Sequence, residues 1–358
     1  MKKKLVGMLA TATLLTMALA GNVQAAEIRS VGPDGEAAVD ASTIELTDDH
    51  IAQIKEGGYT AAICLHYGGN DWSTSQQKGL EDTFGELGIE IVAVTDANFS
   101  AETQVSNIET VMAKKPDILV SIPTDATATA DAYKQAAAAG IKIVFMDQRA
   151  DGLEAGKDYV SVVSADNYGN GYASGTVLGD ALGGKGKVAM VYYDANFAPT
   201  NQRDEGFRDA MKNYPDIEIV TEQGFTDESG CAEQGDAILT QFPNIDGIYA
   251  SWDVPMEGVL SAVRAAGMEG KVTLACNDLG NNVAREIASG NIAGGGAQMP
   301  YDQGVAEAKL AALALLGEET PSYVAVPAET VTHENVLEAY TDVYHVETPD
   351  WLKEAYVE

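Results

Sequence analysis

The strongest constraint on the fold of this chain is a regular alternation between short apolar runs and longer segments whose apolar residues recur with helical period. The apolar runs lie at 59–65, 90–94, 118–122, 142–146, 159–163, 187–193, 217–221, 247–251, 272–276 and 293–298. The helical segments between them include 73–87, 101–114, 126–139, 168–182, 202–213, 230–241, 257–266, 281–289 and 302–316. Repeated β-α-β units require right-handed crossovers and a parallel sheet that helices cover on both faces. The sequence therefore predicts an α/β fold.

An internal repeat indicates that this chain forms two lobes. The sequence GIEIV at 88–92 returns as DIEIV at 216–220, and KPDILVS at 115–121 returns loosely as FPNIDGI at 242–248. The members of each pair lie about 127 or 128 residues apart, a length that fits one α/β lobe. We therefore expect two similar Rossmann-like lobes with parallel sheets.

The N-terminus has the features of a secretory signal peptide. Three lysines at 2–4 precede a mostly apolar run at 5–20, and small residues before Ala26 form a cleavage site. The run is shorter than the roughly 20 apolar residues that span a membrane. Asn22 stands where a lipoprotein carries its lipid-modified cysteine. We expect cleavage after Ala25 and a protein without a lipid anchor, located in the periplasm or, in a cell with one membrane, secreted.

Composition excludes several classes of function. The chain has 22 Lys and Arg against 54 Asp and Glu, a net charge of −32, which repels nucleic acid and anionic lipid. Cys64, Cys231 and Cys276 form no CxxC pair and are expected to be buried thiols. The histidines form no HExxH motif, which argues against a zinc site. Ser174 replaces the third glycine of a dinucleotide fingerprint at 169–174, which argues against a nicotinamide cofactor. We predict no metal, no cofactor, no nucleic-acid partner and, because of self-repulsion, a monomer.

The candidate binding residues follow the apolar runs, because ligands of an open α/β sheet bind beyond the carboxyl ends of its strands. The candidates are His66, Asn70, Asp71 and Trp72 after the first run, Asp125 after the third, Asp147 and Gln148 after the fourth, Arg203 at the start of the segment 202–213, Trp252 and Asp253 after the eighth, Asn277 and Asp278 after the ninth, and Gln298 at the end of the tenth. Carboxylates and amides suit vicinal hydroxyls, and indole rings stack on the C–H face of a sugar ring. The set indicates a neutral polyhydroxy ligand, and a sugar fits it best.

Several motifs resemble those of type I periplasmic solute-binding proteins of the ribose/galactose class, the receptor components of sugar ABC importers. They are PTD at 123–125, VFMD at 144–147, SADN at 164–167, GGKGKV at 183–188, RDEGF at 203–207 and AQMPY at 297–301. The resemblance covers 59–317 and implies a binding protein and not an enzyme, with ABC permease membrane subunits as partners. It places ligand contacts on Asn70, Trp72, Asp147, Arg203, Asp278 and Gln298.

The resemblance also implies a domain layout with discontinuous lobes hinged by interlobe crossovers. The expected parts are the signal peptide at 1–25, a lead-in at 26–58, an N-terminal lobe at 59–163 plus 299–317, a C-terminal lobe at 164–298, and a C-terminal extension at 318–358 that packs on the lobes. The crossings are expected near 163–166, near 298–302 and after Leu316.

Three departures from the ribose type bear on the ligand. Gln148 stands where ribose-type members carry Arg, Trp252 where they carry Asn, and Ser73 where a second stacking aromatic is usual. Because of these changes, another pentose, a hexose or a polyol fits the predicted pocket as well as ribose does. Two other functions also stay open: a sugar receptor for a chemoreceptor or sensor kinase, and a secreted carbohydrate-active enzyme that uses two of the candidate acids.

Overall fold

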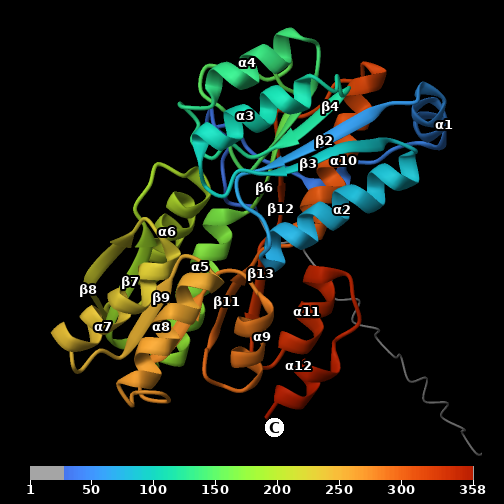
Figure 1. The fold of residues 1–358 in the computed structure, drawn as a ribbon. Helices are drawn as coiled ribbons and strands as arrows, with labels where there is room; N and C mark the ends of the chain where they lie inside the picture. The colour runs from blue at the N-terminus through green and yellow to red at the C-terminus, as the bar shows by residue number, and fades with distance from the viewer. Residues whose placement is uncertain (1–27, 358) are drawn as a thin grey trace, which may run out of the picture.

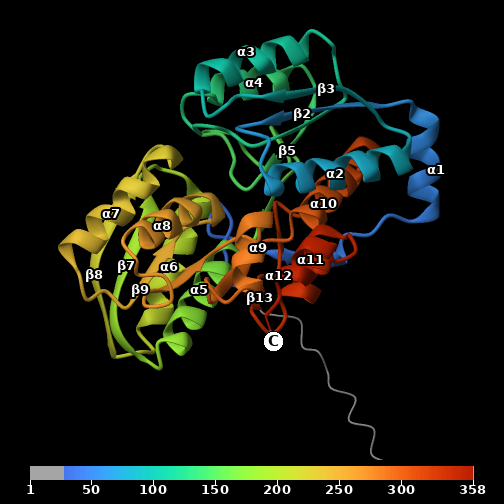
Figure 2. The same cartoon turned by 60° about the horizontal axis from the view of Figure 1, so that its bottom comes forward.

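The computed structural model describes residues 28–357 and contains two sheets, each with helices on both faces (Figure 1). The predicted signal peptide at 1–25 lies outside the described residues. A view turned by 60° separates the two sheets into two lobes (Figure 2). The predicted α/β fold with two parallel-dominated sheets is confirmed.

The first lobe is built on a sheet whose strand pairs are all parallel. In spatial order its strands are β1 (Val39–Asp40), β12 (Tyr323–Val326), β6 (Ser161–Ala165), β5 (Lys142–Met146), β4 (Ile118–Ser121), β2 (Thr60–Leu65) and β3 (Glu90–Asp96). One face packs against α1 (Asp48–Gly57), α2 (Asp71–Leu87) and α10 (Pro300–Leu316), and the other against α3 (Ala101–Met112) and α4 (Ala130–Ala138). The central strands are buried on both faces, which explains why they are continuous apolar runs without alternation.

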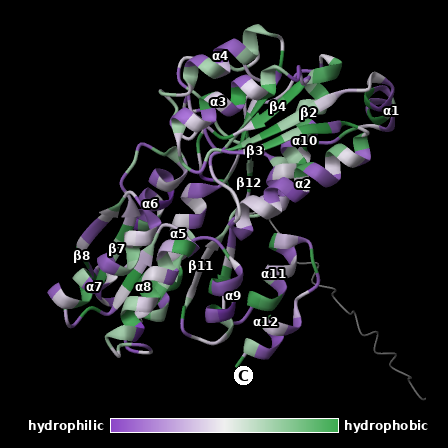
Figure 3. Cartoon of the chain, in the orientation of Figure 1, coloured by the Kyte–Doolittle hydropathy of each residue, from purple (hydrophilic) through white to green (hydrophobic). Residues whose placement is uncertain are grey.

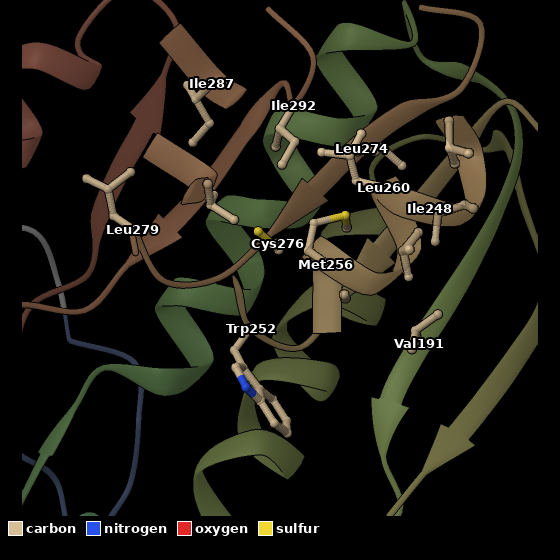
Figure 4. Packing of buried hydrophobic residues seen from close by; sticks show 14 of the residues in the cluster. Val191, Ile248, Trp252, Met256, Leu260, Leu274, Cys276, Leu279, Ile287 and Ile292 are labelled. Carbon is tan, nitrogen blue, oxygen red and sulfur yellow. The ribbon is translucent and has the colours of Figure 1, made fainter. Parts of the chain in front are cut away.

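The second lobe repeats this arrangement with one antiparallel strand, β13, at the edge of its sheet. In spatial order its strands are β13 (Glu329–Thr332), β11 (Gly294–Ala297), β10 (Thr273–Cys276), β9 (Gly247–Ala250), β7 (Lys185–Tyr193) and β8 (Asp216–Phe225). One face packs against α5 (Asn167–Ala181) and α6 (Ala198–Met211). The other packs against α7 (Cys231–Gln241), α8 (Asp253–Ala265), α9 (Asn281–Ala288), α11 (Val336–Tyr344) and α12 (Asp350–Ala355). Figure 4 shows part of this second core, with Trp252 at the margin of the labelled side chains.

The chain passes between the lobes at several points. Strand β6 of the first sheet leads directly into α5 of the second lobe, and β11 of the second sheet leads into α10 of the first lobe. Strands β12 and β13 are close in sequence but belong to different sheets. The segment 318–358, expected to pack on the lobes as an extension, therefore supplies strands to both sheets before it forms α11 and α12.

The lead-in contacts both lobes beside the crossover after β6. The backbone N–H groups of Arg29 and Ser30 donate to the carboxylate of Asp166, at 3.0 and 2.8 Å, and Asp166 also caps the start of α5. A few residues later, Asp34 forms an ion pair with Arg149 of the first lobe, with 2.8 Å between the charged atoms. The lead-in then adds β1 to the edge of the first sheet.

Hydropathy follows this layered arrangement. Hydrophobic residues concentrate on the sheets and on the inward sides of the helices, whereas the outer helical surfaces are largely hydrophilic (Figure 3). Cys64, Cys231 and Cys276 are buried free thiols, as predicted. Among residues 28–357, no helix combines the length and the apolar character needed to cross a bilayer.

Candidate functional site

A cavity lies between the two lobes, at the carboxyl ends of strands from both sheets. The empty space that its lining borders, open solvent included, is about 560 Å³. The lining side chains are His66, Tyr67, Asn70, Trp72, Phe99, Ile122, Thr124 and Asp147 from the first lobe, and Tyr193, Phe197, Pro199, Thr200, Arg203, Trp252, Asp278 and Gln298 from the second. The cavity thus takes half of its lining from each lobe.

The two lobes each place one aspartate in the cavity with the same backbone device. Asp147 follows β5 and Asp278 lies two residues after β10, and both have left-handed backbones, with φ of 55° and 70°. Such conformations cost energy for a residue other than glycine and concentrate at binding and active sites. Backbone hydrogen bonds hold them, because the N–H of Asp147 donates to Val163 and that of Asp278 donates to Gly296.

A chain of hydrogen bonds starts at Asp147 and runs through the crossover. The hydroxyl of Ser164, near the end of β6, donates to Asp147 Oδ1 over 2.8 Å. The side-chain amide of Asn167, the first residue of α5, donates to the Ser164 hydroxyl over 2.9 Å. In the second lobe, Arg203 Nε donates to Asn167 Oδ1 over 2.8 Å. The polar groups of the two lobes are therefore connected through the residues where the chain crosses.

The same chain continues from Arg203 to the second aspartate. Arg203 Nη1 donates to Asp278 Oδ2 over 3.1 Å, and the amide of Gln298 donates to Asp278 Oδ1 over 2.8 Å. Burial acts to lower the pKa of Arg203, but the charges of Asp278 and Asp147, together with that of Tyr249 and the hydrogen bond to Asp278, raise it above the usual value. Arg203 is therefore a permanent buried cation, and both oxygens of Asp278 accept hydrogen bonds from protein groups.

Asp147, by contrast, accepts no hydrogen bond from a charged group of the described residues. Its carboxyl group therefore loses its proton less readily. Burial raises the pKa of the Asp147 carboxyl to about 6, against the opposing effects of the Ser164 hydrogen bond and the Arg203 charge. A carboxyl with this pKa loses its proton just below neutral pH. The charge on Asp147 then has neutral donors around it, and ligand hydroxyls are suited to complete this set.

Aromatic rings form the wall of the cavity around His66. Ring centroids of Tyr67, Trp72, Phe99 and Phe197 lie between 4.6 and 5.9 Å from the His66 ring. Burial lowers the pKa of His66 to about 3, so its imidazole is neutral. The wall therefore offers apolar faces and uncharged polar edges.

Four buried polar atoms of the lining have no hydrogen-bond partner within the described chain. They are His66 Nδ1, Trp72 Nε1, Thr124 Oγ1 and Gln298 Oε1. Buried polar groups in folded proteins are nearly always paired, so unpaired ones that line a cavity are suited to a polar ligand or to water. The cavity therefore combines donors and acceptors with aromatic faces.

Eight of the candidates from the sequence line this cavity, and five do not. Those that line it are His66, Asn70, Trp72, Asp147, Arg203, Trp252, Asp278 and Gln298. Arg203 does not begin its helix as expected, because α6 starts at Ala198 with Pro199 in its first turn, which puts Arg203 one turn further along. Asn70 also caps α2, through its side-chain acceptor for the N–H of Ser73, and Trp252 donates to Glu228.

The remaining five candidates make contacts away from the cavity lining. Gln148 donates to the carbonyl of Pro123 and accepts from the N–H of Ala198, and thereby joins the lobes. Asp125 accepts from backbone N–H groups before α4, and Asp253 accepts from those of Val254 and Gly280.

Asp71 and Asn277 complete this group. Asp71 joins the lobes by accepting from the backbone and side chain of Asn281 at the start of α9, and Asn277 is buried against Ser174, Tyr249 and Ser251. A position after a strand therefore did not determine where these side chains point.

Part of the lining was not among the candidate residues. The omitted residues are Tyr67, Phe99, Ile122, Thr124, Tyr193, Phe197, Pro199 and Thr200. The rule of inspecting strand ends, applied to β3 as well, leads to Phe99, and applied to the whole loop after β7 leads to Phe197. The SADN motif at 164–167 contains both residues of the hydrogen-bonded link, Ser164 and Asn167, but the motif alone does not indicate what they bind.

Comparison with known proteins agrees with this arrangement. The family model "Periplasmic binding protein domain" matches residues 61–319. A D-ribose/D-allose-binding protein of Pseudomonas aeruginosa is 29% identical to 73% of this chain, a match that covers 83% of that protein. These lengths include most of both lobes.

Two solved structures are similar over nearly their whole length. One is an ABC transporter periplasmic solute-binding protein of Actinobacillus succinogenes with bound D-allose, with a TM-score of 0.72 and 29% identity over 78% of this chain and 99% of that chain. The other is an ABC transporter solute-binding protein of Agrobacterium vitis with bound α-D-tagatopyranose, with a TM-score of 0.74 and 25% identity over 82% of this chain and 100% of that chain. With a family model that matches most of its length, this chain belongs to the periplasmic binding protein family.

Proposed function

We propose that this chain is the substrate-binding component of a sugar ABC importer, which closes its lobes on a monosaccharide or polyol and presents the closed form to the permease. The observation that carries this proposal is the interlobe cavity, to which the first lobe contributes Asp147 and the second contributes Asp278 and Arg203. A ligand that bonds to both lobes stabilises closure, because its contacts are complete only when the lobes are together. The relatives with bound D-allose and α-D-tagatopyranose favour a ligand of hexose size.

The ligand contacts that we propose are Asn70, Trp72, Asp147, Arg203, Trp252, Asp278 and Gln298, together with His66. The crossings after β6, after β11 and between β12 and β13 serve as the hinge in this proposal. We also propose export to the periplasm, a monomer, and binding without a covalent step. Hydrolysis of a glycoside needs a pair of available carboxyl groups, and both oxygens of Asp278 already accept from Arg203 and Gln298.

A thermal-shift panel tests this function. The panel contains D-allose, D-tagatose, D-ribose, D-xylose, L-arabinose and myo-inositol, added to the purified ligand-free protein. A ligand at 100 times its dissociation constant adds about 2.7 kcal/mol to the free energy of unfolding, which gives a clear rise in the melting temperature.

Two matched variants locate the response. Asp147→Asn should reduce the shift, whereas Asp125→Asn should not, because the Asp125 carboxylate is exposed and bonded to its own loop. No shift with any member of the panel would contradict the proposal. Release of reducing ends from disaccharides would favour the enzyme instead.

A further inference from the structure

A second group of buried polar side chains lies between α2 and α10, adjacent to the cavity but outside its lining. It consists of Gln76 from α2 and of Gln303 and Glu307 from α10, and each has 0% exposure. Gln76 Nε2 donates to Glu307 Oε1 over 2.6 Å, and Gln303 Nε2 lies 3.4 Å from Asp147 Oδ1. We call these three residues the polar triad. The triad thus extends from a fully buried acid to a carboxylate of the cavity.

Close packing of the two helices seals the triad from water. A Cβ atom added to Gly79 of α2 would lie 2.2 Å from the carbonyl oxygen of Tyr301, and one added to Gly304 of α10 would lie 2.2 Å from that of Gln76. Any side chain at either glycine would therefore push the helices apart. The triad sits beside this backbone contact and beside a cluster of buried hydrophobic side chains from the same two helices.

Three acceptor atoms of the triad have no donor in the part of the chain that the structure describes. Gln76 Oε1, Gln303 Oε1 and Glu307 Oε2 are all buried without a hydrogen-bond partner. An ionised Glu307 would add only acceptors to this set. A protonated Glu307 instead supplies an O–H donor, and Gln303 lies four residues earlier on α10, the spacing at which side chains on one helix face can interact.

The surroundings of Glu307 also disfavour a negative charge. The strands packed against this face of α10 contribute Val144, Met146, Val163, Val324 and Val326, which are apolar. Among the described residues, the nearby lysines are engaged elsewhere: Lys309 donates to the carbonyl of Ile44, and Lys78 pairs with the exposed Asp82.

The charged group that does face Glu307 is Asp147, which has the same sign. A buried carboxylate without a cation is among the costliest groups in a protein interior. Burial, and then the charge on Asp147, raise the pKa of Glu307 well above its usual value.

We propose that Glu307 carries a proton in the folded protein and that, through Gln303, the polar triad positions Asp147 to accept hydrogen bonds from the ligand. This inference rests on the proposed function, because it assigns Asp147 to the ligand. Glu307 is a positioning residue, since it touches neither the cavity nor the ligand. Its proton fixes the Gln303 amide so that Nε2 faces Asp147, and it prevents repulsion between two neighbouring carboxylates.

The proposal has a specific consequence for pH. Affinity for the sugar rises as Asp147 ionises and falls again at alkaline pH, when Glu307 loses its proton beside the charged Asp147. The same deprotonation destabilises the ligand-free fold. A folded-state pKa above the unfolded value means that the stabilising contribution is complete at acid pH and is lost as pH rises through the folded-state pKa.

The variant Glu307→Gln tests whether the proton on Glu307 is needed, because an amide mimics the protonated acid but cannot lose its proton at alkaline pH. Affinity for D-allose is measured by calorimetric titration between about pH 5 and 10, and thermal unfolding of the ligand-free protein is measured over the same range. The wild type should lose about tenfold in affinity on the alkaline side, or 1.4 kcal/mol, and Glu307→Gln should stay within about threefold. The matched control is Glu81→Gln on α2, an exposed glutamate that should retain the wild-type profile.

Two further measurements separate the parts of the inference. The infrared band of a protonated carboxylic acid should be present in the ligand-free wild type at neutral pH and weaker in Glu307→Gln. Gln303→Leu should lower affinity across the whole pH range, because it removes the link between Glu307 and Asp147. An identical band in wild type and Glu307→Gln, or equal pH profiles for the two proteins, would overturn the inference.

The outcome also distinguishes this inference from the proposed function. A wild type that binds none of the sugars in the thermal panel would overturn the positioning role together with the proposed function. The infrared band and the ligand-free unfolding profile would still decide whether Glu307 is protonated.

Discussion

The two lobes present the same side chain to the cavity and hold it in opposite ways. Asp147 of the first lobe accepts from the hydroxyl of Ser164 and lies near the amide of Gln303, whereas Asp278 of the second lobe is paired with the guanidinium of Arg203. Both aspartates have left-handed backbones after a strand. The difference indicates that Asp278 and Arg203 form a fixed, charge-balanced unit, while the charge on Asp147 depends on pH and on the ligand.

The largest effect is expected from removal of the Arg203 guanidinium, the cation that pairs with Asp278. Arg203→Met should lower the free energy of unfolding by about 3–5 kcal/mol and abolish sugar binding, because it leaves Asp278 buried without a countercharge. Denaturant unfolding and calorimetric titration measure the two effects. The control is Arg208→Met on the same helix, whose ion pair with Glu222 is partly exposed and should cost about 1 kcal/mol or less. A loss below 1 kcal/mol for Arg203→Met would show that Asp278 does not need its partner.

Neutralising each aspartate should separate binding from stability. Asp147→Asn and Asp278→Asn should each weaken sugar binding by about 1–3 kcal/mol, or roughly ten- to a hundredfold. The first variant replaces a proposed acceptor for ligand hydroxyls, and the second also removes the carboxylate that pairs with Arg203. Only Asp278→Asn should also destabilise the ligand-free protein, since it leaves Arg203 as an uncompensated buried charge. Equal melting temperatures for the two ligand-free variants would contradict the contrast between the lobes.

A smaller effect is expected in the pH dependence of stability, to which the two cavity aspartates should contribute differently. Burial raises the folded-state pKa of Asp147 to about 6 from a usual value of 3.8. The contribution of this carboxyl to stability is therefore complete below about pH 4 and is lost as pH rises through about 6. Because Asp204 also has its pKa raised to about 6 by burial, the measurement is the difference between wild type and Asp147→Asn. Between pH 4 and 7 the free energy of unfolding of the variant should rise relative to that of the wild type. A difference that does not change with pH would show that Asp147 does not titrate in this way.

The smallest effect concerns a contact between the lobes. Asp71 accepts from the backbone N–H and the side-chain amide of Asn281, at 2.7 and 2.8 Å, at a position near solvent. Asp71→Ala should weaken sugar binding about twofold, or roughly 0.5 kcal/mol, because it removes two solvent-exposed hydrogen bonds between the lobes. Titration calorimetry is precise enough to detect it. Asp131→Ala, an exposed first-lobe change whose carboxylate approaches Lys134, should leave affinity unchanged.

The fold was predictable because the alternation of apolar runs and helical segments leaves few arrangements for a chain of this length. The exact ends of strands and helices could not be predicted, because they depend on tertiary contacts. The run at 159–163 begins two residues before strand β6, and α6 begins at Ala198 because Pro199 favours the first turn of a helix. The strand from Tyr323 to Val326 lies in the segment expected to form a C-terminal extension, although it enters the first sheet between β1 and β6.

The candidate site was partly predictable for a related reason. Strand ends indicate which residues meet, so Asp147, Arg203, Asp278 and Gln298 were found. They do not indicate which way a side chain points, so Gln148 was assigned to the ligand although its amide bonds to backbone groups of both lobes. The polar triad had no sequence signal, because glutamine and glutamate on a helix are ordinarily exposed and their burial depends on how α2 meets α10.

The hydrogen-bonded link from Asp147 through Ser164 and Asn167 to Arg203 has a consequence for the kinetics of binding. Ser164 and Asn167 flank the point where the chain leaves β6 for α5, so rotation of the lobes about that point strains or breaks this link. Substituting Ser164 should therefore change the closed fraction of the ligand-free protein, and the apparent affinity should change with that fraction. Under the proposed function, the residence time of a captured sugar should then depend in part on residues that lie outside the cavity lining.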